Sequence, residues 1–248
     1  GEVSIAARLA LATPDERMAA ADAFRLARYR PAKAKAEHLP VSLAGVLNRS
    51  LWGRHAWLGR DSLLHVPAGT VRVHGVPFEI GTVPRRGTKA GTAPGAVVLR
   101  STKARTSRGR ALPTSVRLTV GKRVQAAYFL WGCGFSGAAE RLAQLTFECN
   151  QGKRTVPIRT PGREPRPFRS EPRGAMIQDW WPSAPQVTYR HSKAWCLTGP
   201  DGDPADYERY LYTFEWRPRS RIQLDSITLS ANPATATTLG LLAVTLQI

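Results

Sequence analysis

The chain has 248 residues and a formal net charge of +18, from 36 Lys and Arg against 18 Asp and Glu. A hydrophobic fraction of 42% is enough for a sizeable core, and because no apolar run approaches the length of a membrane span, we expect no membrane-spanning helix. The charge favours attraction to polyanions, but it equally describes a solvated basic surface. Cys133, Cys149 and Cys196 have no zinc-ligand spacing, and their odd number predicts buried thiols, or one pair and one free thiol.

The first 39 residues differ from the rest of the chain. Thr13 and Pro14 are followed by two acidic residues, which is typical of a helix start with an N-cap, a proline at the first helical position and acids in the first turn. Alanine-rich sequence and then a basic linker follow, so we expect residues 1–39 to be a helical arm and linker, separable from a domain over residues 40–248. No signal peptide is visible, and the non-methionine start indicates a processed protein or a piece of a longer one.

From residue 40 onward, short apolar runs alternate with turns rich in Gly and Pro, which predicts strands. The run Val124–Trp131 is apolar throughout and is expected to be a central strand. Gly152 supplies a positive φ for the turn of a hairpin. The expected strands of this part are residues 71–81 (two strands around Gly75), 96–99, 116–120, 124–131, 142–149 and 154–158.

Residues 207–248 predict three consecutive strands. The first, residues 207–216, places aromatic side chains on one face and polar side chains on the other. The second, residues 222–229, alternates with one slip of phase at Ser226, which indicates a β-bulge. The third, residues 239–248, is nearly all apolar and must therefore be covered on both faces.

These strands predict an all-β fold in which two antiparallel sheets pack face to face. The 21 Gly and 19 Pro that punctuate the runs favour such a sandwich over an α/β fold. The residues expected in its core include Tyr128, Leu130, Phe147, Phe214, Leu242 and Val244.

A set of fragments, taken in chain order, carries a family resemblance. They include residues 66–70, 73–80, 112–116, 120–122, 128–130, Asp179-Trp180-Trp181, Ala194-Trp195, 210–216 and 224–227. Together they resemble galactose-binding-like β-sandwich modules, which are often appended to glycoside hydrolases and other large secreted or surface proteins of environmental bacteria. The resemblance covers residues 40–248 and implies an antiparallel jelly roll with a binding role, usually for carbohydrate, and no catalysis of its own. The chain departs from such modules in its high positive charge and in a Pro/Arg-rich segment at residues 160–174.

Catalysis has no motif to support it. The five histidines are scattered without a metalloprotease spacing, and no nucleophile elbow or phosphate-binding loop is present. We expect a protein that is not an enzyme.

Sugar binding requires an exposed aromatic ring, because the C–H face of a pyranose packs on a π surface, and polar side chains at the rim for the hydroxyls. Trp180 and Trp181 are adjacent, so on a strand they point to opposite faces and one of them is expected to be buried. For each of these tryptophans the alternative to sugar binding is burial in the core. The candidate carbohydrate-binding residues are Trp180, Trp181, Asp179, Trp52, Trp57 and His191.

Basic loops form the second candidate site, since residues 84–125 contain many Lys and Arg and no acid. The candidate polyanion-binding residues are Arg85, Arg86, Lys103, Arg105, Arg108 and Arg110. Aromatic residues are sparse in these loops, which argues against a stacking binder of single-stranded nucleic acid.

One acidic loop offers a possible metal site. Asp201, Asp203 and Asp206 provide oxygen ligands of the kind that a structural calcium ion takes, although Asp-Gly-Asp-Pro is also ordinary loop sequence. No other cofactor is expected.

The leading hypothesis is a non-catalytic carbohydrate-binding or adhesion module of a larger extracytoplasmic protein, at the cell surface, in the periplasm or outside the cell. The first alternative is an assembly domain whose basic surface binds acidic partner proteins, such as the rest of a parent protein. The second is a binder of a polyanion, either acidic polysaccharide or, less in keeping with the sequence, nucleic acid.

Overall fold

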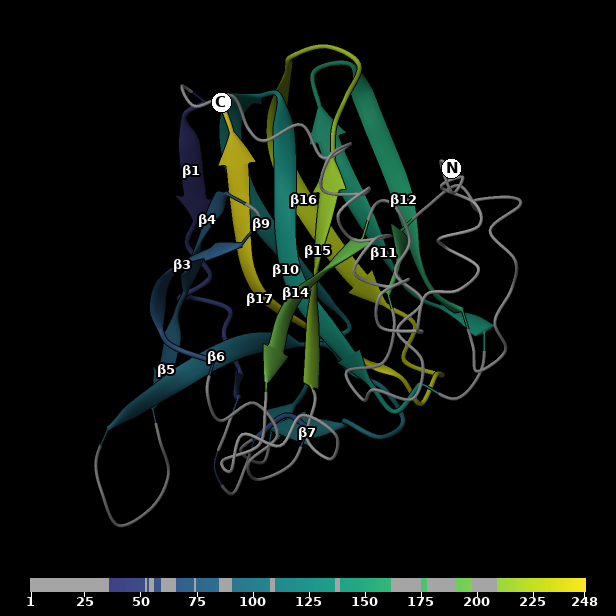
Figure 1. Cartoon of the computed structure of the whole chain (residues 1–248). Coiled ribbons are helices and arrows are strands. Elements are labelled where there is room, and N and C mark those ends of the chain that lie inside the picture. The colour runs from purple at the N-terminus through teal and green to yellow at the C-terminus, as the bar shows by residue number, and fades with distance from the viewer. Residues whose placement is uncertain are drawn as a thin grey trace, which may run out of the picture. The chain divides into compact units, whose positions relative to one another are not determined.

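A computed structural model of the chain describes residues 36–51, 53, 56–58, 66–73, 75–84, 91–107, 110–136, 139–161, 175–177, 191–197 and 209–248 (Figure 1). These residues contain strands and no helix, and none of them offers a helical segment that is long and apolar enough to cross a membrane. The predicted helical arm falls outside the described residues. The expected linker ends earlier than residue 39, because strand β1 already begins at His38.

The larger sheet, called the first sheet, has eight strands. Its main order is β14–β15–β10–β17–β6–β2, with β1 paired to β17 and β5 paired to β6. The bounds are β1 His38–Val41, β2 Arg49–Ser50, β5 Thr82–Pro84, β6 Thr92–Val98, β10 Ala126–Gly134, β14 His191–Leu197, β15 Arg209–Trp216 and β17 Thr238–Gln247.

The second sheet has five strands in the order β13–β12–β11–β16–β9. Its bounds are β9 Ser115–Val124, β11 Ala139–Cys149, β12 Gly152–Pro161, β13 Ala175–Met176 and β16 Ile222–Ala231. Two small hairpins complete the described strands: β3 Gly69–Val73 with β4 Val76–Ile80, and β7 Thr106–Ser107 with β8 Arg110–Ala111. The strands of both sheets pair antiparallel, except for the short parallel pair β12–β13.

The two sheets pack face to face around a common core, and in Figure 1 the second sheet lies behind the first. Aromatic rings cross the space between them: Phe147 of β11 stacks on Trp216 of β15 with ring centroids 3.8 Å apart. Within the first sheet, Trp131 of β10 stacks on Phe214 of the neighbouring strand β15 at 5.5 Å. The predicted all-β antiparallel sandwich is therefore confirmed, and so is the burial of Tyr128, Leu130, Phe147, Phe214, Leu242 and Val244.

A third layer covers the outer face of the first sheet. Thr245 of β17 points away from the common core, and its hydroxyl donates to the Pro77 carbonyl of β4 at 2.6 Å. The indole N–H of Trp57 donates to Thr238 at 3.0 Å on the same strand. Buried side chains of this layer, outside the common core, include Leu51, Val71, Val73, Val76, Phe78 and Ile80. Because apolar layers lie on both sides, β10 and β17 are buried at every position, as the apolar runs predicted.

The outer face of the second sheet is polar. Along β9, Val116 and Leu118 are buried whereas Arg117 and Thr119 are exposed. In the register of the sheet, the residues directly beside Arg117 on successive strands are threonines: Thr228 of β16, Thr146 of β11 and Thr155 of β12. Arg117 also forms an ion pair of 2.5 Å with Glu148. No described strand pairs or packs over this face, which follows the alternating pattern of a sheet with one solvated side.

Two local predictions are also confirmed. The bulge expected near Ser226 leaves Asp225 without a partner, because Glu148 pairs with Ser226 and Cys149 pairs with Leu224. The turn after Cys149 uses Gly152 with a φ of 94°. Cys133 and Cys149 are buried free thiols, so the first alternative, buried thiols without a disulfide, holds for these two residues.

Candidate ligand-binding end

Loops from distant parts of the chain meet where β10 ends and β17 begins. Gly134 at the end of β10 pairs with Thr238, and the Leu99 N–H donates to the Leu239 carbonyl at 3.2 Å. Neighbouring strands are about 4.8 Å apart, so the Phe135 loop and the loop after Leu99 leave the sheet roughly 10 Å from one another. We call this region the aromatic end and define it as residues 100–107, 110–111, 134–136 and 231–238.

Buried hydroxyl groups fix the loops of the aromatic end. The Thr102 N–H donates to the Thr235 carbonyl at 2.8 Å, which ties the first loop to the last. The Ser101 hydroxyl accepts the N–H groups of Lys103 and Ala104 at 3.2 and 3.0 Å. Ser101 and Thr235 are only 2% and 7% exposed. Loops fixed in this way lose little conformational entropy when a ligand binds.

Phe135 is the unusual residue of this end. It is 49% exposed and is the only large hydrophobic side chain that is exposed among the described residues. Its φ of 64° lies in the left-handed region, which costs a bulky side chain on the order of 1–3 kcal/mol. Neither burial among the described residues nor backbone preference accounts for a phenylalanine here, which makes Phe135 a candidate for contact with a ligand.

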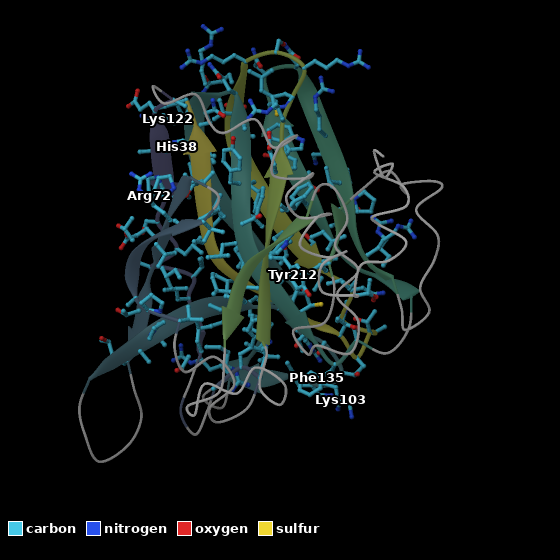
Figure 2. The ribbon with its side chains drawn as sticks, viewed as in Figure 1. His38, Arg72, Lys103, Lys122, Phe135 and Tyr212 are labelled. Carbon is cyan, nitrogen blue, oxygen red and sulfur yellow. The ribbon has the colours of Figure 1, made fainter. Side chains whose placement is uncertain are left out.

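Cationic side chains lie at the same end. Lys103, Arg105 and Arg110 are all exposed, and Figure 2 shows Lys103 at the same end of the sandwich as Phe135. The Arg105 side chain donates through Nε to the Thr102 carbonyl at 3.2 Å, so its guanidinium is held close to the fixed loop. An exposed aromatic face with Lys and Arg donors at the same end of the sandwich has the chemistry to hold a sugar ring and its oxygen substituents.

One predicted binding residue has to be corrected. Trp57 is only 6% exposed, and its six-membered ring packs so closely that a Cβ on Gly240 would come within 2.4 Å of it. The ring belongs to the third layer of the fold and offers no surface to a ligand. The Gly/Arg/His composition of its loop indicated exposure, but it did not reveal that glycines on β10 and β17 leave room for an indole.

The other predicted site residues fall into two groups. Lys103, Arg105 and Arg110 are brought together at the aromatic end. His191 lies in β14, opposite Phe214 in the register. The candidates Trp52, Trp180, Trp181, Asp179, Arg85, Arg86, Arg108, Asp201, Asp203 and Asp206 lie outside the described residues. Within the described part of the chain, no group of His, Cys, Asp or Glu has the arrangement of a metal site.

Phe135 is the residue that sequence reasoning missed. It stands in Gly132-Cys133-Gly134-Phe135-Ser136-Gly137, directly after an apolar strand. An aromatic side chain surrounded by glycine and serine was the available signal, because such a segment leaves the sheet and has no strand partner to bury it.

Comparison with known proteins adds no relative: no protein-family model matches the chain, and no curated protein matches it significantly. The likeness to galactose-binding-like modules therefore rests on the sequence fragments described above.

Proposed function

We propose that the chain is a non-catalytic carbohydrate-binding or adhesion module that binds a sugar at the aromatic end. The observation that carries this proposal is the exposed Phe135 ring, held in a costly backbone conformation at the same end of the sandwich as loops that hydrogen bonds fix. A ring of this kind stacks on the C–H face of a pyranose, and Lys103 and Arg105 supply donors to its oxygen atoms. The resemblance to galactose-binding-like modules agrees with this role and with a place in a larger extracytoplasmic protein.

The experiment is a glycan array with the full chain, followed by calorimetry with the best ligand. Phe135→Ala is expected to weaken binding at least tenfold, because it removes the stacking surface, and Phe135→Trp is expected to retain it. The matched control is Leu39→Ala, which truncates a hydrophobic side chain far from this end. Circular dichroism of each variant shows whether the fold is intact. A Phe135→Ala protein that is folded and binds the glycan as tightly as the parent would rule out this site.

A further inference from the structure

The end of the sandwich opposite Phe135 carries a concentration of positive charge that comes from three separate turns. These turns join β9 to β10, β11 to β12, and β15 to β16. The exposed cations of these turns and of the strand residues next to them are Lys122, Arg123, Lys153, Arg154, Arg217, Arg219 and Arg221, which we call the basic end. Figure 2 shows Lys122 at this end, far from Phe135 and Lys103. The nine residues of β10 separate the two ends by roughly 25 Å.

Strand register brings the three turns together. At the start of β16, Gln223 pairs with Arg123 and Leu224 pairs with Lys122. On the other side of the same strand, Leu224 pairs with Cys149, and the Asn150 N–H donates to the Gln223 carbonyl at 3.1 Å. The first residues of β16 therefore lie between the β9–β10 turn and the β11–β12 turn, so the cations of all three turns occupy one surface.

Most of these cations have no carboxylate partner in the part of the chain that the structure describes. Lys153 lies 3.7 Å from Glu148, and Arg217 pairs with Glu215. Asp225 and Glu37 are further acids at this end. Lys122, Arg123, Arg154, Arg219 and Arg221 form no ion pair with any described residue. An excess of unpaired, exposed cations on one surface attracts an anionic partner over several ångströms at physiological salt.

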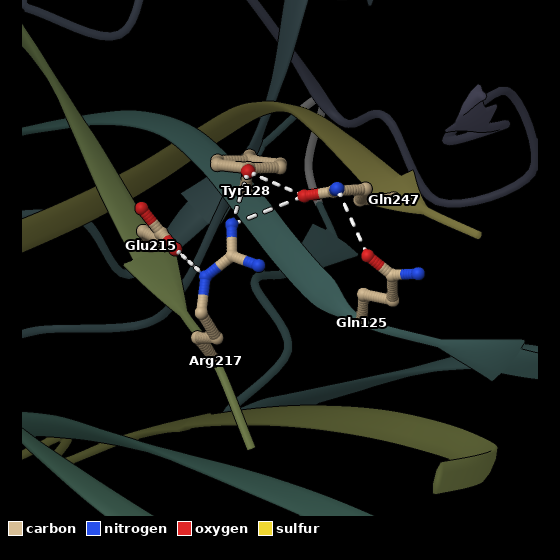
Figure 3. A network of polar contacts seen from close by, with 5 residues as sticks. All are labelled: Gln125, Tyr128, Glu215, Arg217 and Gln247. Carbon is tan, nitrogen blue, oxygen red and sulfur yellow. Dashed lines mark hydrogen bonds and ion pairs between the residues drawn. The ribbon is translucent and has the colours of Figure 1, made fainter. Parts of the chain in front are cut away.

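A polar network holds the β15–β16 turn in place (Figure 3). Arg217 donates to the Tyr128 hydroxyl at 2.9 Å and to Oε1 of Gln247 at 3.0 Å, and it also pairs with Glu215. The Tyr128 hydroxyl donates to Gln247 at 2.9 Å. Burial, aided by the Glu215 charge, raises the pKa of Tyr128 to about 12, so this hydroxyl stays protonated and able to donate well above neutral pH. With Arg217 anchored inward, the turn that presents Arg219 and Arg221 is ordered before a ligand arrives.

We propose that the basic end is a binding surface for an acidic polysaccharide, whose carboxylate or sulfate groups are held by the cations of the three turns. Arginine binds such groups with two parallel hydrogen bonds, and five of the seven cations are arginines. A single-stranded nucleic acid is the less suitable partner, because the described part of this end exposes no aromatic ring on which a base can stack. Duplex DNA needs no such ring, so the test compares it directly with the polysaccharides. The surface lies at the other end of the sandwich from Phe135, so this proposal does not depend on the proposed sugar site.

The test measures the affinity of the full chain for a polyuronate, for heparin and for duplex DNA at several salt concentrations. For the parent, binding to the two polysaccharides is expected to weaken steeply as salt rises, because each ionic contact releases counterions. The variant Arg219→Gln/Arg221→Gln removes two contacts, so the slope of log affinity against log salt is expected to become less steep by about two. Lys122→Gln/Arg123→Gln, on a different strand, is expected to do the same.

The matched control is Arg141→Gln/Arg159→Gln. These two exposed arginines face each other across β11 and β12 on the same sheet, away from the basic end, and their removal changes the net charge by the same amount. The control is expected to keep the parent slope. A slope that falls equally in the control would mean that binding reflects overall charge, and the basic end would be rejected as a site. Tighter binding of duplex DNA than of either polysaccharide at the same salt would overturn the choice of partner. Thermal unfolding of each variant confirms that the fold is retained.

Discussion

The two sheets of this sandwich differ in what covers them. The first sheet is covered on one side by the second sheet and on the other by the β3–β4 hairpin and Trp57, so β10 and β17 have no exposed position. The second sheet is covered on one side only, and β9 alternates between buried and exposed residues. The difference shows that a strand has apolar residues at nearly every position when both of its faces are buried, and that burial matters more here than strand propensity.

The largest expected effect on stability comes from comparing truncated side chains on the outer faces of the two sheets. Leu130 lies on the outer face of the first sheet and is fully buried, so Leu130→Ala is expected to lower the free energy of unfolding by about 2–5 kcal/mol. Thr228 lies on the outer face of the second sheet, and Thr228→Ala is expected to cost less than about 1 kcal/mol. Urea denaturation measures both. Equal losses would mean that the third layer does not contribute a core of its own.

Contact between the third layer and the first sheet is tested at Gly240. A Cβ added there would come 2.4 Å from the Trp57 ring, which is rigid, so Gly240→Ala is expected to cost about 1–3 kcal/mol. The matched control is Gly45→Ala, where no heavy atom lies within 4 Å of the new methyl group. Thermal unfolding compares the two. If both substitutions have the same effect, Trp57 does not pack against the sheet in this way.

A pH effect is expected where β1 borders the first sheet. Burial lowers the pKa of His38 below its ordinary value of 6.5; the Arg72 charge adds to this effect, and a backbone hydrogen bond with Ala36 opposes it. Its Nε2 is also buried and has no hydrogen-bond partner among the described residues. The unfolded chain therefore takes up a proton before the folded chain does, so stability is expected to fall as pH drops below about 6.5.

Replacing this histidine isolates its share of the pH effect. His38→Gln keeps a polar side chain of similar size without a titrating group, so its stability is expected to change less between pH 7.5 and 5.5. Chemical denaturation at several pH values measures the difference. The same pH dependence in parent and variant would assign the effect to other groups.

The smallest expected effect on stability concerns Phe135, which directly follows strand β10. Phe135→Gly places a glycine at a φ of 64°, where it has no steric penalty, so stability is expected to stay equal or to rise by up to about 1 kcal/mol. Phe135→Ala keeps the strained conformation and serves as the comparison. A clear loss of stability in Phe135→Gly would show that the ring is a structural part of the fold, which would weaken the proposed sugar site.

The fold could be predicted from sequence where the pattern is local. The phase slip at Ser226 indicated a bulge that lies next to it at Asp225, and Gly152 marked the turn of a long hairpin. The apolar run Leu239–Ile248 also showed that β17 needs cover on both faces. These features depend on residues that are close in sequence, so periodicity and turn chemistry contain them.

The candidate surfaces could not be predicted in the same way. Lys122, Lys153 and Arg219 are far apart in the chain, and only the register of β9, β11 and β16 places them on one surface. The burial of Trp57 depends on two glycines that are distant in sequence. Such juxtapositions are tertiary facts, and composition shows only that charges and aromatic residues are present.

The position of β17 in the first sheet has a consequence for synthesis of the protein. This strand comes after every other described strand, yet it pairs with β10 on one side and with β6 and β1 on the other. A growing chain on the ribosome therefore cannot close the first sheet until residue 247 has emerged from the exit tunnel. Until then, the apolar strand β10 lacks its neighbour along that edge, so we expect the first sheet to close late, with this edge of β10 open to wrong pairing in the meantime.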